Sequence, residues 1–159
     1  MIRTNGMKHT WMLGIVVITL AAVALGPRPA AAIIDTDVRA GVYSDMSAVS
    51  LGGGLLSSMG SRWYFNPNIE AAFGDNGNLM TLNGDFHYDF AVERPVSVYL
   101  GGGPAVLFAH PDGSDSRADI GLNLLGGVAG MHGDVRPFAQ IKGVMSDNSE
   151  VALMGGIRF

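Results

Sequence analysis

The residues of this sequence that could do chemistry are charged side chains that recur at every second position. Asp85, His87 and Asp89 alternate with aromatic residues, and successive side chains of a β-strand point to opposite faces. The same spacing predicts a shared polar face for ten ionisable residues: Asp37, Arg39, Arg62, Glu70, Asp85, His87, Asp89, Lys142, Glu150 and Arg158. Buried charges must pair or be neutralised. We therefore expect an ion-pair network that rigidifies a closed interior. The alternative is a gate whose pairs rearrange to let water or ions through.

Histidine-based catalysis is a second possibility, because a serine hydrolase needs a histidine beside a hydroxyl and a carboxylate. His87 has no serine near it in the sequence, and His132 stands alone before a glycine. Only His110 precedes a segment that offers these groups, namely Asp112, Ser114, Asp115 and Ser116. We expect no catalytic residues and no enzyme, and His110 is the candidate for the alternative.

Metal and cofactor sites are not expected. The chain has no cysteine, which excludes a disulfide framework, a zinc finger, an iron–sulfur site and a cysteine nucleophile. The segment from Asp112 to Ser116 lacks the glutamate at the twelfth position of a calcium-binding loop. The two triple-glycine segments are not followed by the lysine of a phosphate-binding loop. A formal net charge of -4 argues against a nucleic-acid partner, whose binding surface needs clustered lysine and arginine.

The first 32 residues predict an export signal. Arg3 and Lys8 are followed by an uncharged, mostly apolar run of 15 residues from Trp11 to Leu25, and then by three alanines that end at Ala32. This order of a basic start, an apolar stretch and small residues is typical of secretory signal peptides. Fifteen residues are short for a membrane-spanning helix. We therefore predict a cleavable signal peptide over residues 1–32 and one domain over residues 33–159.

Apolar residues recur with period two over the rest of the chain, which predicts strands rather than helices. Turn-forming residues divide this pattern into eight runs: 35–44, 48–65, 68–74, 79–91, 95–109, 119–133, 137–146 and 150–159. One expected turn is Asn66–Pro67–Asn68, and the longest expected loop runs from Pro111 to Ala118. Pro104 predicts a bulge or a local break within its run, because proline cannot donate a hydrogen bond to a neighbouring strand.

The polar face is rich in glycine as well as in charge, and this composition favours the inside of a barrel. The interior of an eight-stranded barrel is only wide enough for side chains to fill, so large residues there need small neighbours. Apolar residues would then face lipid, as in an outer-membrane barrel. The reversed arrangement would be a soluble periplasmic barrel that binds an apolar ligand. Aromatic residues near the ends of the runs predict two girdles at the membrane surfaces: Trp63, Phe65, Phe73, Phe90 and Phe108.

Besides the export signal and the eight alternating runs, two segments are typical of a known family. They are Gly60 to Glu70 and the terminal Gly155–Gly156–Ile157–Arg158–Phe159. Together these features resemble the small outer-membrane β-barrel family, which includes the OmpA transmembrane domain, OmpX and the opacity proteins. The resemblance implies an all-β fold, an eight-stranded antiparallel up-and-down transmembrane β-barrel in a bacterial outer membrane. It also implies that the barrel-assembly machinery reads a signal formed by Leu153, Gly155, Ile157 and Phe159.

This family hosts pores, adhesins, structural anchors and lipid enzymes, so the fold leaves the function open. We expect a structural role in envelope integrity or surface interaction. The alternatives are a narrow gated channel for water, ions or small solutes and a rim-located enzyme that modifies lipid A through His110. The expected partners are outer-membrane lipid and lipopolysaccharide, with periplasmic chaperones and the assembly machinery during biogenesis. We expect a monomer without a cofactor.

Overall fold

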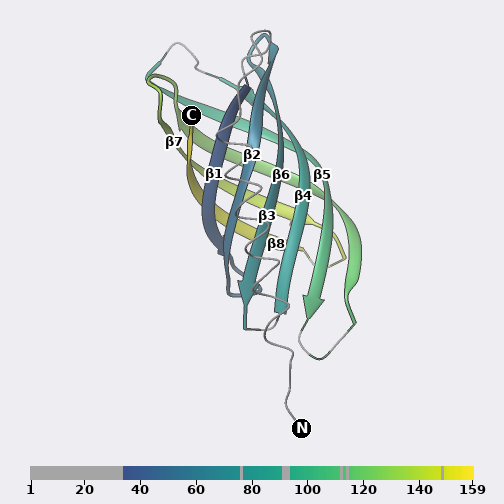
Figure 1. The fold of residues 1–159 in the computed structure, drawn as a ribbon. Helices are drawn as coiled ribbons and strands as arrows, with labels where there is room; N and C mark the ends of the chain where they lie inside the picture. Colours follow the sequence, from purple (N-terminus) through teal and green to yellow (C-terminus); the bar gives the residue numbers. More distant parts are fainter. Residues whose placement is uncertain (1–33, 76, 91–93, 112, 114, 148) are drawn as a thin grey trace. The chain divides into compact units, whose positions relative to one another are not determined.

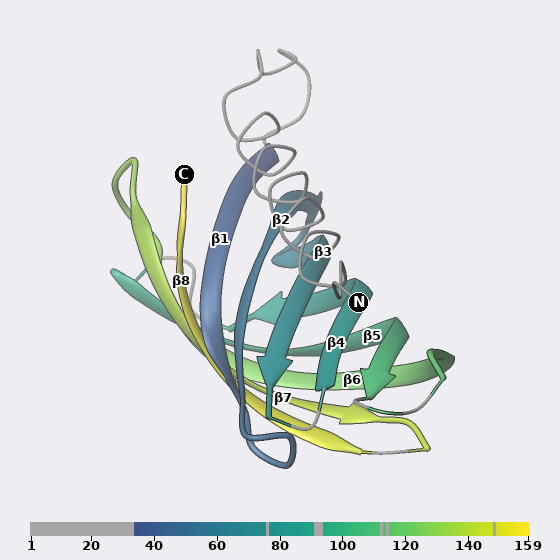
Figure 2. The ribbon, with the colours of Figure 1, turned by 60° about the horizontal axis from the view of Figure 1, so that its bottom comes forward.

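The computed structural model describes residues 34–75, 77–90, 94–111, 113, 115–147 and 149–159, which form a closed antiparallel barrel (Figure 1). In chain order the strands are β1 (Ile34–Tyr43), β2 (Ala48–Gly60), β3 (Trp63–Gly74), β4 (Gly77–Asp89), β5 (Val96–Pro111), β6 (Arg117–Gly130), β7 (Arg136–Met145) and β8 (Glu150–Arg158). Each strand pairs with the next, and β8 closes the barrel on β1 (Figure 2). The predicted all-β, eight-stranded up-and-down architecture is confirmed. The predicted signal peptide lies outside the described residues.

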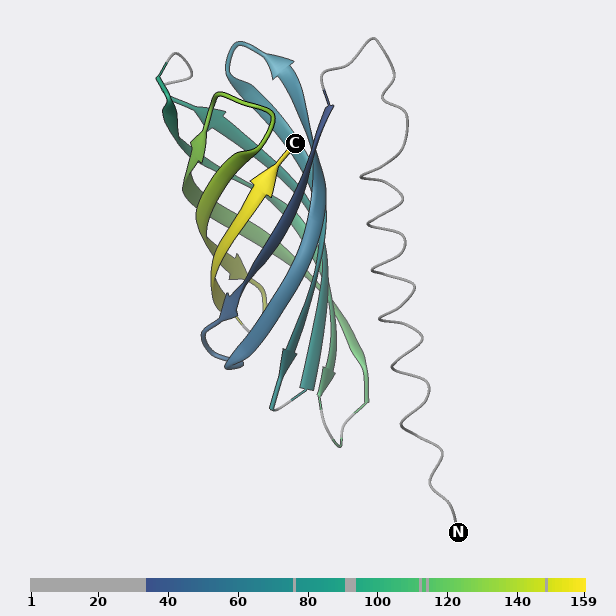
Figure 3. The same cartoon turned by 60° about the vertical axis from the view of Figure 1, so that its left-hand side comes forward.

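The barrel has two rims. The terminal rim is where β1 begins and β8 ends, and it carries the β2–β3, β4–β5 and β6–β7 connections. The opposite rim carries the other four connections. There β6 projects beyond β7, because their pairing starts only at Leu122 with Met145 (Figure 3). The β5–β6 connection is shorter than the predicted loop from Pro111 to Ala118, since β6 already begins at Arg117.

Side chains alternate between the two faces of the sheet, as period two requires. In β4, buried residues alternate with exposed or half-buried ones from end to end. The outer face carries large apolar side chains such as Leu82, Leu124 and Leu153, which are 44%, 56% and 60% exposed. Polar and charged side chains face inward, which is the predicted order of the two faces. Separately, no helix in the described residues is long and apolar enough to cross a membrane.

The turn between β2 and β3 lies at Ser61 and Arg62, and the predicted turn at Asn66–Pro67–Asn68 is wrong. Ser61 and Arg62 have φ angles of 49° and 72°, and two residues with positive φ form the tight turn whose twist suits a hairpin. Both asparagines lie within β3 and are buried. Asparagine beside proline is typical of turns, but here the amides find hydrogen-bond partners inside the barrel.

Pro104 leaves the register of the barrel unchanged. The pairing of β5 with β6 continues through Pro104, which lies opposite Leu122. On its other side, the pairing of β4 with β5 lapses at Gly84 and Asp85 and resumes in the same register. Pro104 therefore causes the predicted local break on one side only, and neither ladder shifts by a residue as a bulge would require.

We predict that Ser61→Asn stabilises the barrel. A left-handed backbone costs an ordinary residue roughly 1–2 kcal/mol, whereas asparagine tolerates it. The free energy of unfolding should rise by about 0.5–1 kcal/mol, as measured by urea unfolding in phospholipid vesicles with Trp63 fluorescence. Ser44→Asn is the control, because Ser44 is also exposed in a turn but has no positive φ. Equal shifts from both substitutions would contradict the explanation by backbone strain.

Candidate functional site in the barrel lumen

The middle of the lumen holds a layer of buried charges, which we call the charge layer: Asp37, Arg39, Glu70, Asp85 and Lys142. Each of these residues is at most 5% exposed. They belong to β1, β3, β4 and β7, and inward positions from different strands converge because the barrel is narrow. Charges at this depth are stable only with partners that replace water.

Arg39 and Lys142 share the carboxylate of Glu70. Arg39 donates two hydrogen bonds to Asp37, from Nε at 2.8 Å and from Nη2 at 2.7 Å, and its Nη1 lies 3.3 Å from Glu70 Oε1. Lys142 Nζ donates to Glu70 Oε2 at 2.5 Å, and the Tyr43 hydroxyl donates to the same oxygen at 2.7 Å. Two cations and two anions therefore compensate one another across β1, β3 and β7.

Asp85 is held by amides. Asn68 Nδ2 donates to its Oδ2 at 2.9 Å, and Asn123 Nδ2 donates to its Oδ1 at 2.8 Å. Asn83 bridges these two amides with bonds of 2.9 Å each, and Asn66 connects them to the ion pairs. Within the described part of the chain, no cation lies at ion-pair distance from Asp85. The charge layer is thus one continuous hydrogen-bonded network with one anion that lacks a cation.

The lumen is apolar between the charge layer and the opposite rim. This apolar layer consists of Tyr43, Ala48, Ala72, Leu79, Ala105, Leu107, Val144, Ala152 and Met154, each at most 5% exposed. Met46 and Ala109 pack against it. This layer was not predicted, although Leu79, Val144 and Met154 share the parity of the inward charges on their strands. Water or ions that passed the charge layer would meet a packed apolar barrier.

On the terminal side of the charge layer the lumen holds a polar and aromatic group, the Tyr99 cluster: His87, Asp89, Tyr99, Gln140 and Arg158. Three apolar residues on the same side, Leu125, Ala129 and Phe138, are buried together with Tyr99. The Tyr99 hydroxyl donates to Gln140 Oε1 at 3.1 Å. The Tyr99 ring lies 4.8 Å from the His87 ring and 5.3 Å from the Arg158 guanidinium. His87 Nε2 lies 3.4 Å from Asp89 Oδ1. Tyr99 therefore contacts Gln140, His87 and Arg158, and Asp89 joins the group through His87.

Gly127 makes room for Tyr99, with which it pairs directly. A Cβ at Gly127 would lie 2.5 Å from Cζ and Oη of Tyr99 and would overlap the carbonyl oxygen of Ala139. We expect Gly127→Ala to lower the free energy of unfolding by about 1–3 kcal/mol, measured by urea unfolding in vesicles. Gly126→Ala is the control, because its Cβ would meet chiefly the flexible end of Leu100. Equal losses from both would mean that glycine at these positions matters for another reason than Tyr99.

Nine of the ten residues predicted to face the lumen do so, and each is at most 9% exposed: Asp37, Arg39, Glu70, Asp85, His87, Asp89, Lys142, Glu150 and Arg158. Arg62 does not face the lumen, so its prediction is wrong. It is exposed in the β2–β3 turn, where its Nη1 donates to the carbonyl of Phe90 at 3.3 Å. Strand alternation does not extend into a turn, which explains the error. Glu150 begins β8 at the opposite rim, away from the charge layer.

The neutral partners of these charges are amides that are not among the predicted site residues. Asn66 and Asn68 were expected in a turn. Period two places Asn83, Asn123 and Gln140 on the polar face, but only the ionisable residues of that face were predicted as site residues. Their signal was parity. Asn66, Asn68, Asn83 and Gln140 each lie an even number of residues from an inward charge on the same strand, and Asn123 pairs with the inward residue Val144. Buried amides are the expected companions of buried charges, since every buried polar group needs a hydrogen-bond partner.

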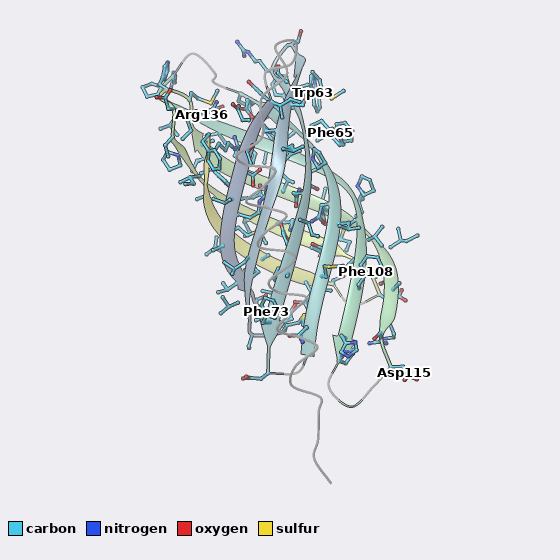
Figure 4. All side chains as sticks on the ribbon, in the orientation of Figure 1. Trp63, Phe65, Phe73, Phe108, Asp115 and Arg136 are labelled. Carbon is cyan, nitrogen blue, oxygen red and sulfur yellow. The ribbon has the colours of Figure 1, made fainter. Side chains whose placement is uncertain are left out.

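The residues predicted for the aromatic girdles lie at both rims (Figure 4). Trp63 and Phe65 are near the terminal rim, and Phe73 and Phe108 near the opposite one. On the terminal side the aromatic residues gather on β3 and β4, where Trp63 packs against Tyr88 at 5.3 Å and Phe65 against Phe86 at 4.6 Å; Phe90, which follows β4, packs on Tyr88 at 5.2 Å. These contacts form two aromatic groups on the same pair of neighbouring strands, Trp63–Tyr88–Phe90 and Phe65–Phe86.

The residues predicted for the assembly signal lie along β8 and just after it. Leu153, Gly155 and Ile157 are exposed on the outer face. Phe159 exchanges two backbone hydrogen bonds with Thr36, at 2.8 and 2.9 Å. The end of the chain is thus tied to the start of β1.

The catalytic alternative rests on His110, whose Nδ1 lies 2.5 Å from Ser116 Oγ at the exposed opposite rim. Asp112 and Ser114 lie outside the described residues. Among the residues that are described, no carboxylate contacts His110, and no group of three or more metal-ligating side chains comes together.

No protein-family model matches the chain, and no curated protein matches it in sequence. Solved structures do match. Neisserial surface protein A is 20% identical, with 79% of this chain and 94% of that chain covered and a TM-score of 0.61. The N-terminal β-barrel domain of Pseudomonas aeruginosa OprF is 18% identical, with 79% and 96% covered and a TM-score of 0.63. Ail, the attachment invasion locus protein of Yersinia pestis, is 16% identical, with 79% and 96% covered and a TM-score of 0.57. The chain therefore has the fold of the small eight-stranded outer-membrane β-barrels.

Proposed function

We propose that this protein resides in the bacterial outer membrane as a closed barrel with a structural role in envelope integrity or surface interaction. The filled lumen supports this proposal most. The charge layer and the apolar layer lie one after the other along the barrel axis. The first fills the lumen with ion-paired and hydrogen-bonded side chains, and the second fills it with packed apolar side chains. An ion-pair network can rearrange, but a packed apolar layer offers ions no replacement for their hydration.

The lipid-facing surface supports the location. Outer-membrane barrels carry an outward apolar band with aromatic residues at the interfaces. Here the outward positions of the strands carry large apolar side chains, and aromatic residues lie at both rims. The partners in this proposal are outer-membrane lipid and lipopolysaccharide, and during biogenesis the periplasmic chaperones and the assembly machinery. The proposed state is a monomer.

The test combines location with conductance. The outer-membrane fraction is run on an SDS gel with and without boiling, and the purified protein is then reconstituted in planar lipid bilayers. We expect a heat-dependent mobility shift in that fraction and no ion conductance. Recovery as a soluble periplasmic protein without a shift would overturn the proposed location, and reproducible conductance steps would overturn the closed state.

A narrow gated channel is the second candidate, and one observation favours it. Asp85 has no cation, while Glu70 binds both Arg39 and Lys142. A cation that moved from Glu70 to Asp85 would rearrange the charge layer without leaving a charge unpaired. Under this candidate Lys142→Ala changes conductance in planar bilayers. Under the closed-barrel proposal both proteins are silent.

A lipid-modifying enzyme is the third candidate, and the short contact of His110 with Ser116 is what favours it. We propose instead that this pair has no catalytic role, because a histidine that activates a serine is normally oriented by a carboxylate. Mass spectrometry of lipid A from strains that express the wild type or His110→Ala tests this point. Identical spectra are expected, and a modification that is lost in the variant would establish the enzyme.

A further inference from the structure

The aromatic side chains of the outer face near the terminal rim are concentrated on two strands. Five of them, which we call the aromatic face, belong to β3, to β4 and to the residue that follows β4: Trp63, Phe65, Phe86, Tyr88 and Phe90. Apart from Phe159 at the chain end, outward positions near this rim on other strands carry aliphatic side chains such as Val96, Val128 and Ile157. Aromatic girdles ordinarily surround a membrane barrel, so the concentration on two strands requires a local explanation.

Arg62 places a positive charge at the end of the aromatic face. It lies in the β2–β3 turn directly before Trp63, it is exposed, and its Nη1 donates to the carbonyl of Phe90 at 3.3 Å. No carboxylate of the described residues lies at ion-pair distance from Arg62, whereas Arg136 at the same rim is paired with Asp35. A guanidinium has more N–H donors than this one bond uses. Arg62 therefore keeps donors for a ligand outside the protein.

Short residues lie next to the aromatic face, toward the middle of the barrel. Pro67 of β3 pairs with Gly84 of β4, and the register of β4 with β5 places Pro104 on the other side of Gly84. A Cβ at Gly84 would lie 3.7 Å from both Cε2 of Phe65 and Cγ of Pro104. Glycine thus leaves space between these two side chains, and an apolar chain can pack there without displacing either of them.

We propose that the aromatic face and Arg62 bind an anionic glycerophospholipid, such as phosphatidylglycerol. The planar guanidinium of Arg62 holds the phosphate, for which its donor geometry is suited. The acyl chains pack against the aromatic rings and beside Gly84. This inference rests on the proposed location in the outer membrane, because only a bilayer brings lipid to the outer face, and it adds the class of lipid and the place where it binds.

The charges at this rim select the headgroup. Arg94, in the β4–β5 connection, is a second exposed arginine with no ion pair to any described residue. A headgroup that carries an ammonium, as in phosphatidylcholine, would meet positive charge here, and a glycerol headgroup would not. Arg62 offers one guanidinium beside Phe90, which suits a lipid with one phosphate, whereas lipid A carries more than one.

Quenching of Trp63 fluorescence by brominated lipid tests the inference. Trp11 and Trp63 are the tryptophans of the sequence, so in a Trp11→Phe background Trp63 reports alone, from within the aromatic face. The protein is purified from the outer membrane and reconstituted in phosphatidylcholine vesicles that contain either brominated phosphatidylglycerol or brominated phosphatidylcholine. The association constant of phosphatidylglycerol relative to phosphatidylcholine should be about two to five, since one exposed charge pair contributes modestly.

Two variants locate the preference. Arg62→Gln should bring the ratio of association constants close to unity. Arg117→Gln is the matched control, because Arg117 is also exposed and unpaired among the described residues but begins β6 at the opposite rim, and it should leave the ratio unchanged. If Arg62→Gln yields no heat-modifiable barrel, molar salt applied to the wild type should lower the ratio, because salt screens exposed charges.

The outcomes separate this inference from the proposed location. Equal quenching by both lipids would overturn the inference and leave the location intact, whereas quenching by neither lipid would overturn both. A preference that survives Arg62→Gln, or molar salt in its place, would also overturn the inference. Stronger displacement of brominated phosphatidylglycerol by lipopolysaccharide than by unlabelled phosphatidylglycerol would assign the aromatic face to lipopolysaccharide instead.

Discussion

Glu70→Ala should destabilise the barrel more than any other single truncation in the lumen. Glu70 is 1% exposed and is the carboxylate that Arg39 and Lys142 share. Its removal leaves Lys142 buried with no anion and takes one of two anions from Arg39. Loss of one partner from a buried ion pair costs about 3–5 kcal/mol, because the remaining charge has neither water nor a counter-ion. Urea unfolding in phospholipid vesicles measures this loss.

Two further variants separate charge from packing. Glu70→Gln keeps an acceptor for Tyr43 and Lys142 and removes only the charge, so its stability should lie between Glu70→Ala and the wild type. The double variant Glu70→Leu with Lys142→Met should recover most of the loss, since Arg39 keeps its two hydrogen bonds to Asp37 and apolar residues often replace buried ion pairs without cost.

The control for Glu70→Ala is Ser50→Ala, which alters an inward side chain of 1% exposure outside the charge layer. It should leave the unfolding midpoint nearly unchanged. If Glu70→Ala and Ser50→Ala had the same midpoint, the charge layer would contribute nothing to stability, and the pairing of Glu70 with Arg39 and Lys142 would need another explanation, such as a channel that depends on Glu70.

The strands and their faces could be predicted because period two is a local property of the sequence. A residue such as Asp85 shows its face through its neighbours, and no knowledge of the rest of the barrel is required. The position of a turn can depend on contacts with other strands. Asn66 and Asn68 have the composition of a turn, and they become strand residues only because Asp37, Leu55 and Asp85 supply partners from other strands.

The division of the lumen into layers could not be predicted from single strands. Whether Val144 and Leu79 meet depends on the stagger of all eight strands, which sets the height of each residue along the axis. The charges were recognisable as inward, but nothing local separates Lys142, which binds Glu70, from Glu150, which lies at the opposite rim. Which side chains contact one another in the lumen depends on the closed barrel, whereas the face of the sheet on which a side chain lies depends on its own strand.

Leu124→Arg is the second large prediction, and it tests the lipid-facing surface. Leu124 lies outward at the middle of β6 and is 56% exposed. On the surface of a water-soluble protein an exposed leucine can be replaced by arginine at little cost. At the midplane of a bilayer the same change costs about 2–4 kcal/mol. We therefore expect a marked fall in the urea concentration at which half of the barrel is unfolded in vesicles. Trp63 fluorescence measures this unfolding.

Ile120→Arg supplies the matched comparison on the same strand. Ile120 is also outward and is 78% exposed, but it lies near the opposite rim, beyond the point where β6 pairs with β7. The cost of arginine falls to roughly 0–1 kcal/mol near a membrane interface, so the two variants should differ clearly although both replace an exposed apolar side chain. Because burial in the protein is low at both sites, only depth in a bilayer accounts for such a difference. Equal stability of the two variants would mean that the outer face meets water, and the exposed leucines would then require a protein partner.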